Sequence, residues 1–282
     1  MRVAESKRDA RAALLAARRR GLSTGLVPTM GALHEGHLSL MRRAVSDCEF
    51  VAATIFVNPT QFAPGEDFDA YPRTRESDLE ACRGVGVHLV FCPSVEEMYA
   101  ADDRTRVIVS GLTAGLCGAH RPGHFDGVTT VVCKLFHILP TDRAYFGEKD
   151  YQQVVVIRKM ASDLDFPIEI VLCPTVREAD GLAMSSRNVY LDGPQRQQAA
   201  SIYAALRWAR DEIAAGAGDA AALSDGVRRR LAAAGPCHVD YIEVVDPETL
   251  TTVTDIMDHV RICVAVRIGN VRLIDNIAAA PP

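Results

Sequence analysis

Short apolar runs alternate with helix-like segments through the first two-thirds of the chain, and this alternation limits the possible folds most strongly. The run Phe50–Val57 is almost continuously apolar, as expected of a strand that is buried on both faces. The predicted strands are Leu26–Pro28, Phe50–Val57, Val87–Phe91, Arg106–Val109, Arg143–Phe146 and Ile168–Leu172, and the predicted helices around them are Ser6–Arg20, Gly36–Val45, Arg75–Arg83, Gly127–Leu139 and Asp150–Asp163. Such alternation, with long crossovers, indicates a parallel sheet.

The pattern changes after about Val176. Two Ala-rich helices are predicted first, and three strands with alternating apolar and polar residues follow. These segments are Pro194–Ala215 and Ala220–Ala234, then His238–Val245, Arg261–Arg267 and Val271–Ile274. Gly269-Asn270 between the last two strands suggests a hairpin. We therefore predict an α/β fold, with a Rossmann-like parallel sheet and helices on both faces in residues 1–176, and a smaller α+β domain in residues 177–282.

Composition excludes several classes of protein. The net charge of −5 gives no reason to expect a nucleic-acid surface or an anionic membrane partner. There is no secretory signal and no apolar run long enough to span a bilayer. The eight cysteines never form a Cys-x-x-Cys pair, and most fall in apolar strand or helix patterns. They are predicted to be buried free thiols of a cytoplasmic protein.

The segment Leu26–Leu40 carries the first candidate site. A strand ends near Pro28 and a helix begins near Gly36, so His34 and His37 lie where one element passes into the next. The first N–H groups of a helix are unpaired and the helix dipole is positive there, which favours a phosphate group. Gly31 and Gly36 would allow an anion to approach the backbone closely.

Two other interpretations of these histidines remain open. A histidine near a helix start is often only a cap or a surface residue. Two histidines three apart could also be metal ligands. The zinc protease helix, however, needs His-Glu-x-x-His, whereas only two residues separate His34 from His37.

Polar residues also follow the other strands. Asn58 to Gln61 come after the second predicted strand, and Gly147 to Gln153 come after Arg143–Phe146. The last strand leads into Ser185-Ser186-Arg187. Because the carboxyl ends of parallel strands share one edge of a sheet, we expect His, Gln, Lys, Ser and Arg side chains to gather there. Taken alone, Lys149 could be a solvated surface lysine, and Ser185-Ser186-Arg187 could be an ordinary loop. The sequence contains neither a P-loop nor a dinucleotide-binding fingerprint.

Longer motifs in this order resemble those of known enzymes. His34-x-Gly36-His37 after a strand, with Met184–Arg187 late in the chain, resembles the paired signatures of the nucleotidylyl transferase superfamily. A closer resemblance, over residues 1 to about 277, is to the pantothenate synthetase (pantoate–β-alanine ligase) family. Its motifs here are Pro28–His37, Phe56–Phe62, Tyr71–Arg73, Phe146–Gln153 and Arg177–Asn188, with no departure at a motif position. The C-terminal domain matches only in general pattern.

The resemblance implies that ATP, (R)-pantoate and β-alanine give pantothenate, AMP and diphosphate through a pantoyl-adenylate. It implies that His37 is the proton donor, that His34 and Lys149 are also catalytic, and that Gln61 and Gln153 bind pantoate, with Gln61 also near β-alanine. The residues implied to surround ATP are Met30, Gly31, Ala32, Leu33, His34, Glu35, Gly36, His37, Gly147, Glu148, Lys149, Asp150, Val176, Met184, Ser185, Ser186 and Arg187. It further implies a cytoplasmic, Mg²⁺-dependent homodimer whose C-terminal domain acts as a lid. It leaves the protein ligands of the metal open.

The chemistry agrees with these roles. A carboxylate that attacks the α-phosphate of ATP needs no protein nucleophile, so catalysis must come from positioning and from stabilising charge on phosphate oxygens. Gln61 and Gln153 are neutral and can orient a hydroxy acid without pairing tightly with its carboxylate. Two other classes remain: an enzyme that adenylylates a phosphate acceptor, for which more arginine is expected, and a regulatory nucleotide-binding module, for which a full set of strand-end polar residues is not needed.

Overall fold

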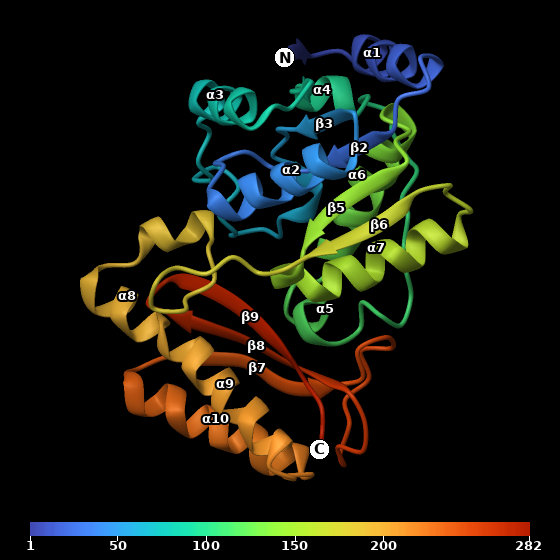
Figure 1. Ribbon diagram of the computed structural model, residues 1–282. Coiled ribbons are helices and arrows are strands. Elements are labelled where there is room, and N and C mark those ends of the chain that lie inside the picture. Colours follow the sequence, from blue (N-terminus) through green and yellow to red (C-terminus); the bar gives the residue numbers. More distant parts are fainter. The chain divides into compact units, whose positions relative to one another are not determined.

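The computed structural model describes residues 1–282, and the chain forms two compact units (Figure 1). The first unit comprises Met1–Ser110, Arg121–Glu148 and Gln153–Pro174. The second unit comprises Gly111–His120, Lys149–Gln152 and Thr175–Pro282. Both units therefore contain segments that are distant in the sequence. No helix is both long enough and apolar enough to cross a membrane.

A six-stranded parallel sheet forms the centre of the first unit, as the alternation predicts. The strand order is β1-β4-β3-β2-β5-β6, and every neighbouring pair is parallel. The strands are β1 (Arg2–Ala4), β2 (Thr24–Val27), β3 (Phe50–Thr54), β4 (Leu89–Phe91), β5 (Arg143–Gly147) and β6 (Glu169–Cys173).

Both faces of this sheet are buried. Successive strand residues point to opposite faces, and neighbours such as Leu26 and Val27, or Ala52 and Ala53, are all fully buried. Val27 and Ala53 join a cluster with Met41 of helix α2, which covers one face. The helices of the first unit are α1 (Lys7–Arg19), α2 (Glu35–Asp47), α3 (Arg75–Val85), α4 (Val95–Met98), α6 (His124–Ile138) and α7 (Tyr151–Asp163), and its 3₁₀ turns are η1 (Pro59–Gln61) and η2 (Glu148–Asp150). Two of these elements are shared with the second unit, which contains the last two residues of η2 and the first two of α7.

Two strands of the first unit differ from the prediction. Arg106–Val109 is not a strand, so that prediction is wrong. Its backbone is bonded instead to side chains of α6, since Val107 N–H donates to Thr130 Oγ1 at 3.0 Å and Val107 O accepts from Thr129 Oγ1. The strand β1 was not predicted, because its three residues are too few to show a pattern and two of them are exposed.

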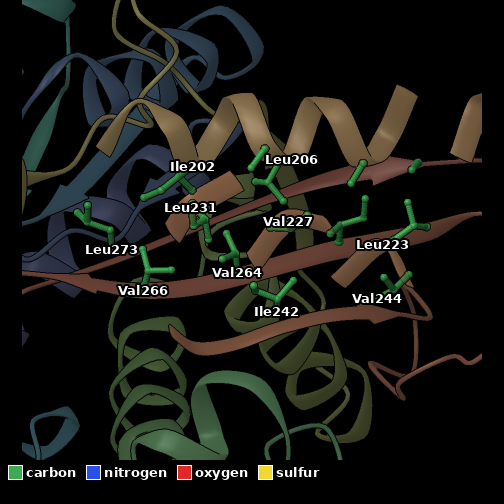
Figure 2. Packing of buried hydrophobic residues seen from close by; sticks show 14 of the residues in the cluster. Ile202, Leu206, Leu223, Val227, Leu231, Ile242, Val244, Val264, Val266 and Leu273 are labelled. Carbon is green, nitrogen blue, oxygen red and sulfur yellow. The ribbon is translucent and has the colours of Figure 1, made fainter. Parts of the chain in front are cut away.

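The second unit contains an antiparallel sheet of β7 (His238–Val245), β8 (Val260–Ile268) and β9 (Val271–Ala279). Ile268 pairs with Val271, so Gly269 and Asn270 form the two-residue loop of the predicted hairpin, with Gly269 at φ +56°. Apolar residues of this sheet pack against helices α9 (Ser201–Ala214) and α10 (Ala220–Ala234), as Figure 2 shows. The unit also contains α5 (Leu116–His120), α8 (Gly193–Ala199) and η3 (Ser186–Tyr190).

The predicted helix Pro194–Ala215 is interrupted, because α8 ends at Ala199 and α9 begins at Ser201. Ala200 between them keeps helical angles, φ −61° and ψ −24°. The interruption is therefore a local change in hydrogen bonding rather than a turn, and it leaves no Pro or Gly signal in the sequence.

Candidate active site

The strand order of the first unit has a topological switch point between β2 and β5. From β2 the chain passes to β3 and β4 on one side, and it later returns to β5 and β6 on the other side. Ligands of open parallel sheets bind beyond the carboxyl ends of strands at such a point. The segment that leaves β2 is Pro28–His37, and the residues that close β5 and follow it in this unit are Gly147 and Glu148.

The turn after β2 is held by the carboxylate of Asp78. Ala32 N–H donates to Asp78 Oδ2 at 2.9 Å, and Leu33 N–H donates to Oδ1 at 2.8 Å. Gly31 and Ala32 both have positive φ, +85° and +49°, and a Cβ on Gly31 would lie 3.0 Å from Asp78 Oδ2 and from a carbon of Ile55. A buried anion thus fixes a strained backbone turn. Nothing in the sequence indicated this role, since Asp78 looks like an ordinary acid in the first turn of α3.

His34 and His37 cap the start of α2 reciprocally. Gly36 N–H donates to His34 Nδ1 at 3.1 Å, and His34 N–H donates to His37 Nδ1 at 3.3 Å. The ring centroids are 4.1 Å apart. Because each Nδ1 is an acceptor, the neutral rings carry their proton on Nε2. The capping interpretation is therefore correct.

Gln61 lies in the 3₁₀ turn η1, where both ends of its amide have partners. Its Oε1 accepts from Asn58 Nδ2 at 3.2 Å, and its Nε2 donates to Met30 Sδ at 3.0 Å. Gly127 of α6 lets this turn approach, because a Cβ there would lie 2.2 Å from Thr60 O. The structure therefore brings together Met30 and Gln61, which were predicted separately.

A charged network supports the same turn from α6 and the loop before it. Arg121 forms two hydrogen bonds with Glu66, at 2.7 and 2.6 Å, and a longer one of 3.4 Å with Gln61 O. His124 Nδ1 lies 2.8 Å from the same carbonyl. Burial raises the pKa of Glu66, but the hydrogen bond and charge of Arg121 outweigh it and lower this pKa overall. Sequence reasoning missed this network, because its members are up to 63 residues apart.

In the second unit, the segment Lys149–Gln152 is fixed by several side chains. Lys149 O accepts from Asn276 Nδ2 at 3.0 Å, and Tyr151 OH donates to Pro247 O at 2.9 Å. Gln152 Oε1 accepts from Cys117 N–H at 2.9 Å. Gln152, which is buried, therefore has a structural role, whereas Gln153 is only half-buried.

The remaining predicted ATP-binding residues form a hairpin-like loop in the second unit. Met184 N–H donates to Val176 O at 3.0 Å, so these two residues are brought together. Gly181 turns the loop at φ +94°. Ser185 caps the following 3₁₀ turn through its Oγ, which accepts from Arg187 N–H at 3.2 Å.

The predicted site residues are therefore divided between the two units. The first unit contains the Met30–His37 turn, Gln61, Gly147, Glu148 and Gln153; the second contains Lys149, Asp150, Val176 and Met184–Arg187. Their assignment to ATP and pantoate stays a prediction. All eight cysteines are free thiols, and six are buried.

Known proteins resemble the chain over nearly its whole length. A model of the family described as pantoate-beta-alanine ligase matches residues 2–278. The pantothenate synthetase of Moorella thermoacetica is 56% identical over 262 residues and covers 93% of each chain. That of Acetivibrio thermocellus is 49% identical over 277 residues, covering 98% of this chain and 99% of its own.

Solved structures give the same result. A crystal structure of pantothenate synthetase from Thermus thermophilus is similar with a TM-score of 0.92 and 48% identity, over 98% of this chain and 99% of that one. Pantoate-beta-alanine ligase from Francisella tularensis, complexed with beta-gamma ATP and beta-alanine, has a TM-score of 0.82 and 33% identity, over 98% and 97% of the two chains. The resemblance expected from the motifs is confirmed, and the chain belongs to the pantoate–β-alanine ligase family.

Proposed function

We propose that this chain is an ATP-dependent ligase that joins (R)-pantoate to β-alanine and forms pantothenate, AMP and diphosphate. The observation that carries the proposal is the family match over residues 2–278. The Francisella tularensis relative, which was crystallised with beta-gamma ATP and beta-alanine, supports a nucleotide and an amino acid as substrates.

In the first step, the pantoate carboxylate attacks the α-phosphorus of ATP. A new P–O bond forms, the bond to the oxygen bridging the α- and β-phosphorus atoms breaks, and diphosphate leaves. We assign the Nε2–H donors of His34 and His37 to phosphate oxygens, since both Nδ1 atoms are occupied by backbone N–H groups. The Lys149 ammonium adds positive charge, so that negative charge on the phosphate oxygens is stabilised as it develops.

We assign pantoate to Gln61 and Gln153. Asn58 and Met30 hold the Gln61 amide in one orientation, with its two ends identified. A preorganised neutral amide can orient a hydroxy acid and leave its carboxylate nucleophilic. Gln61 is also our candidate for contact with β-alanine.

Mg²⁺ fits this chain as a companion of ATP. No group of three or more His, Cys, Asp or Glu side chains is arranged as a metal cage. Mg²⁺ commonly retains several waters and is held by substrate phosphates with one or two carboxylates. The predicted ATP-binding residues include three acids, Glu35, Glu148 and Asp150. Of these, Glu148 and Asp150 flank Lys149 and are our candidates to hold the ion. Bound in this way, the ion would neutralise charge on the diphosphate leaving group.

In the second step, the amine nitrogen of β-alanine attacks the acyl carbon of pantoyl-adenylate and a C–N bond forms. The bond between that carbon and the oxygen that it shares with the phosphate breaks, AMP leaves with this oxygen, which came from the pantoate carboxylate, and the nitrogen loses a proton, which is released with the products. Water would hydrolyse this intermediate, so the site must exclude it. We propose that residues 177–282 provide the cover, and that the enzyme is a cytoplasmic homodimer.

Isotope exchange tests the reaction. Labelled diphosphate should enter ATP when pantoate is present without β-alanine, and should not do so when pantoate is absent. An enzyme that adenylylates a phosphate acceptor would exchange with that acceptor instead, and a regulatory module would not exchange at all. Exchange that required β-alanine would contradict a pantoyl-adenylate intermediate.

A further inference from the structure

Strand β9 carries two adjacent polar residues that are both buried, Asp275 and Asn276. Successive side chains of a strand point to opposite faces of the sheet. A buried carboxylate or amide is costly unless it is hydrogen-bonded. Both residues have partners, and these include groups in the two segments of the second unit that carry predicted ATP-binding residues.

Asn276 holds the Lys149 segment. Its Nδ2 donates to Lys149 O at 3.0 Å, while its Oδ1 accepts from Arg261 Nη1 at 2.6 Å. The Arg261 guanidinium lies 3.8 Å from the centroid of the Tyr151 ring, two residues after Lys149. One buried amide thus links β9 to η2, and the adjacent arginine of β8 packs on the start of α7.

Asp275 holds the loop on the other side of the strand. Its oxygens accept from Arg177 Nη1 at 2.6 Å and Nη2 at 3.0 Å. Arg177 also donates to Gly181 O at 3.1 Å and lies 3.6 Å from the centroid of the Tyr203 ring. Because Arg177 lies next to Val176, which is bonded to Met184, this ion pair fixes the base of the loop that leads to Ser185–Arg187.

The Asp275 carboxylate also interacts electrostatically with Lys149. Burial raises the pKa of Asp275, and the Arg177 hydrogen bonds and charge oppose that rise. A smaller opposing contribution comes from the Lys149 ammonium. Asp275 therefore interacts electrostatically with a charged group of each segment, Arg177 and Lys149.

We infer that Asp275 and Asn276 are positioning residues of the ligase reaction, which align Lys149 and the Val176–Arg187 loop from opposite faces of β9. This inference rests on the proposed function. Neither residue needs to touch a substrate, since each acts through the backbone or the arginine that it holds.

The decisive test is a double-mutant cycle. Asn276→Ala should lower kcat about 10- to 100-fold, as displacement of a catalytic group by an ångström can, with little change in the KM for β-alanine. In a Lys149→Ala background the same substitution should lower the remaining rate less than about twofold, because its effect passes through Lys149. Equal losses in the two backgrounds, or a wild-type kcat in folded Asn276→Ala, would overturn the inference.

Asp275→Asn tests the other side of the strand. It retains the shape of the side chain but removes the charge that holds Arg177. The KM for ATP should rise about tenfold, while the KM for β-alanine changes little. The matched control is Asp240→Asn, since Asp240 is an acid on β7 whose side chain is equally buried and pairs with Arg272 and Arg267. A similar KM for ATP in the two variants would contradict the role of Asp275.

Hydrogen exchange provides a readout that does not depend on activity. Asn276→Ala should speed amide exchange in a peptide covering residues 149–153, whereas Asp240→Asn should not. If Asn276→Ala fails to fold, Asn276→Asp keeps an acceptor for Arg261 and replaces the donor to Lys149 O with a carboxylate oxygen, which cannot donate. Unchanged amide exchange in the folded variant would overturn the inference. An inactive wild-type chain would contradict the proposed function, and the exchange measurement would still test the inference in that case.

Discussion

At the scale of single residues, the main result is that the paired histidines have two roles at once. By accepting backbone N–H groups at Nδ1, His34 and His37 complete the start of α2 and also fix the tautomer of each ring. The spacing of the histidines could be read from the sequence. The hydrogen bonds between Asp78 and the turn before them could not be predicted, because Asp78 lies 45 residues after Leu33 and looks like any acid early in a helix.

Asp78→Asn should therefore weaken ATP binding without altering the chemistry assigned to the histidines. The new NH₂ group would face Ala32 N–H or Leu33 N–H, and hydrogen bonds to a charged group contribute about 1.5–3 kcal/mol. We expect the KM for ATP to rise about tenfold or more. The control is Glu76→Gln, which changes the same charge at an exposed position of α3. Steady-state kinetics would decide, and a wild-type KM in the first variant would show that Asp78 is not needed.

At the scale of elements, function depends on how closely two elements approach. The 3₁₀ turn η1 lies against α6 only because Gly127 has no side chain. The sequence predicted α6 and identified Gln61, but not their contact. Similarly, Arg106–Val109 has the apolar residues of a strand, but its backbone is bonded to hydroxyl groups of α6. Periodicity reports which face of an element is buried, and not which partner satisfies its backbone.

Gly127→Ala should push η1 away from α6. We expect a loss of stability of about 1–3 kcal/mol from overpacking and a higher KM for pantoate, since Gln61 moves with the turn. Gly84→Ala is the control, because a Cβ on that helical glycine of α3 meets nothing within 4 Å and should be neutral or stabilising by up to about 1 kcal/mol. Thermal unfolding and pantoate titrations would measure both effects. An unchanged KM for pantoate in Gly127→Ala would contradict the assignment of Gln61 to pantoate binding.

The pair Arg121–Glu66 should make stability depend on pH. The pKa of Glu66 is lowered in the folded protein, so its contribution is present above the unfolded value of about 4.3 and is lost as pH falls through the folded value. We expect Glu66→Gln to lower the melting temperature by a constant amount at pH 6–7, and this difference should shrink below about pH 4. A difference that grew on acidification would contradict the predicted sign. Glu80→Gln, an exposed change on α3, should show no such trend.

At the scale of the whole molecule, the cysteines contribute to packing rather than to chemistry. Burial raises the pKa of Cys82 to about 12 and that of Cys92 to about 11. At neutral pH these thiols carry almost no thiolate, which is the reactive form. The sequence predicted buried free thiols from the absence of any Cys-x-x-Cys pair and from the apolar surroundings, and six of the eight cysteines are buried.

Thiol reagents should therefore inactivate the enzyme slowly at pH 7.5, and ATP with pantoate should not protect it. Cys133 and Cys237, which are only partly buried, should react first with no loss of activity. Mass spectrometry of labelled peptides and parallel activity assays would check this, with circular dichroism to detect unfolding. Rapid inactivation that the substrates blocked, in a protein that stayed folded, would point to a cysteine in the site.

The position of Asp275 and Asn276 on β9, near residue 282, has a consequence for the synthesis of the enzyme. Chains are made from the amino terminus, and domains tend to fold in that order. Lys149 and the Val176–Arg187 loop therefore emerge from the ribosome long before Asp275 and Asn276. Until β9 pairs with β8, neither segment has its partner. A polypeptide that still lacks β9 contains the strands of the parallel sheet and the histidine cap, but under the role inferred for Asp275 and Asn276 its ligase activity should stay low until β9 has been made and has paired with β8.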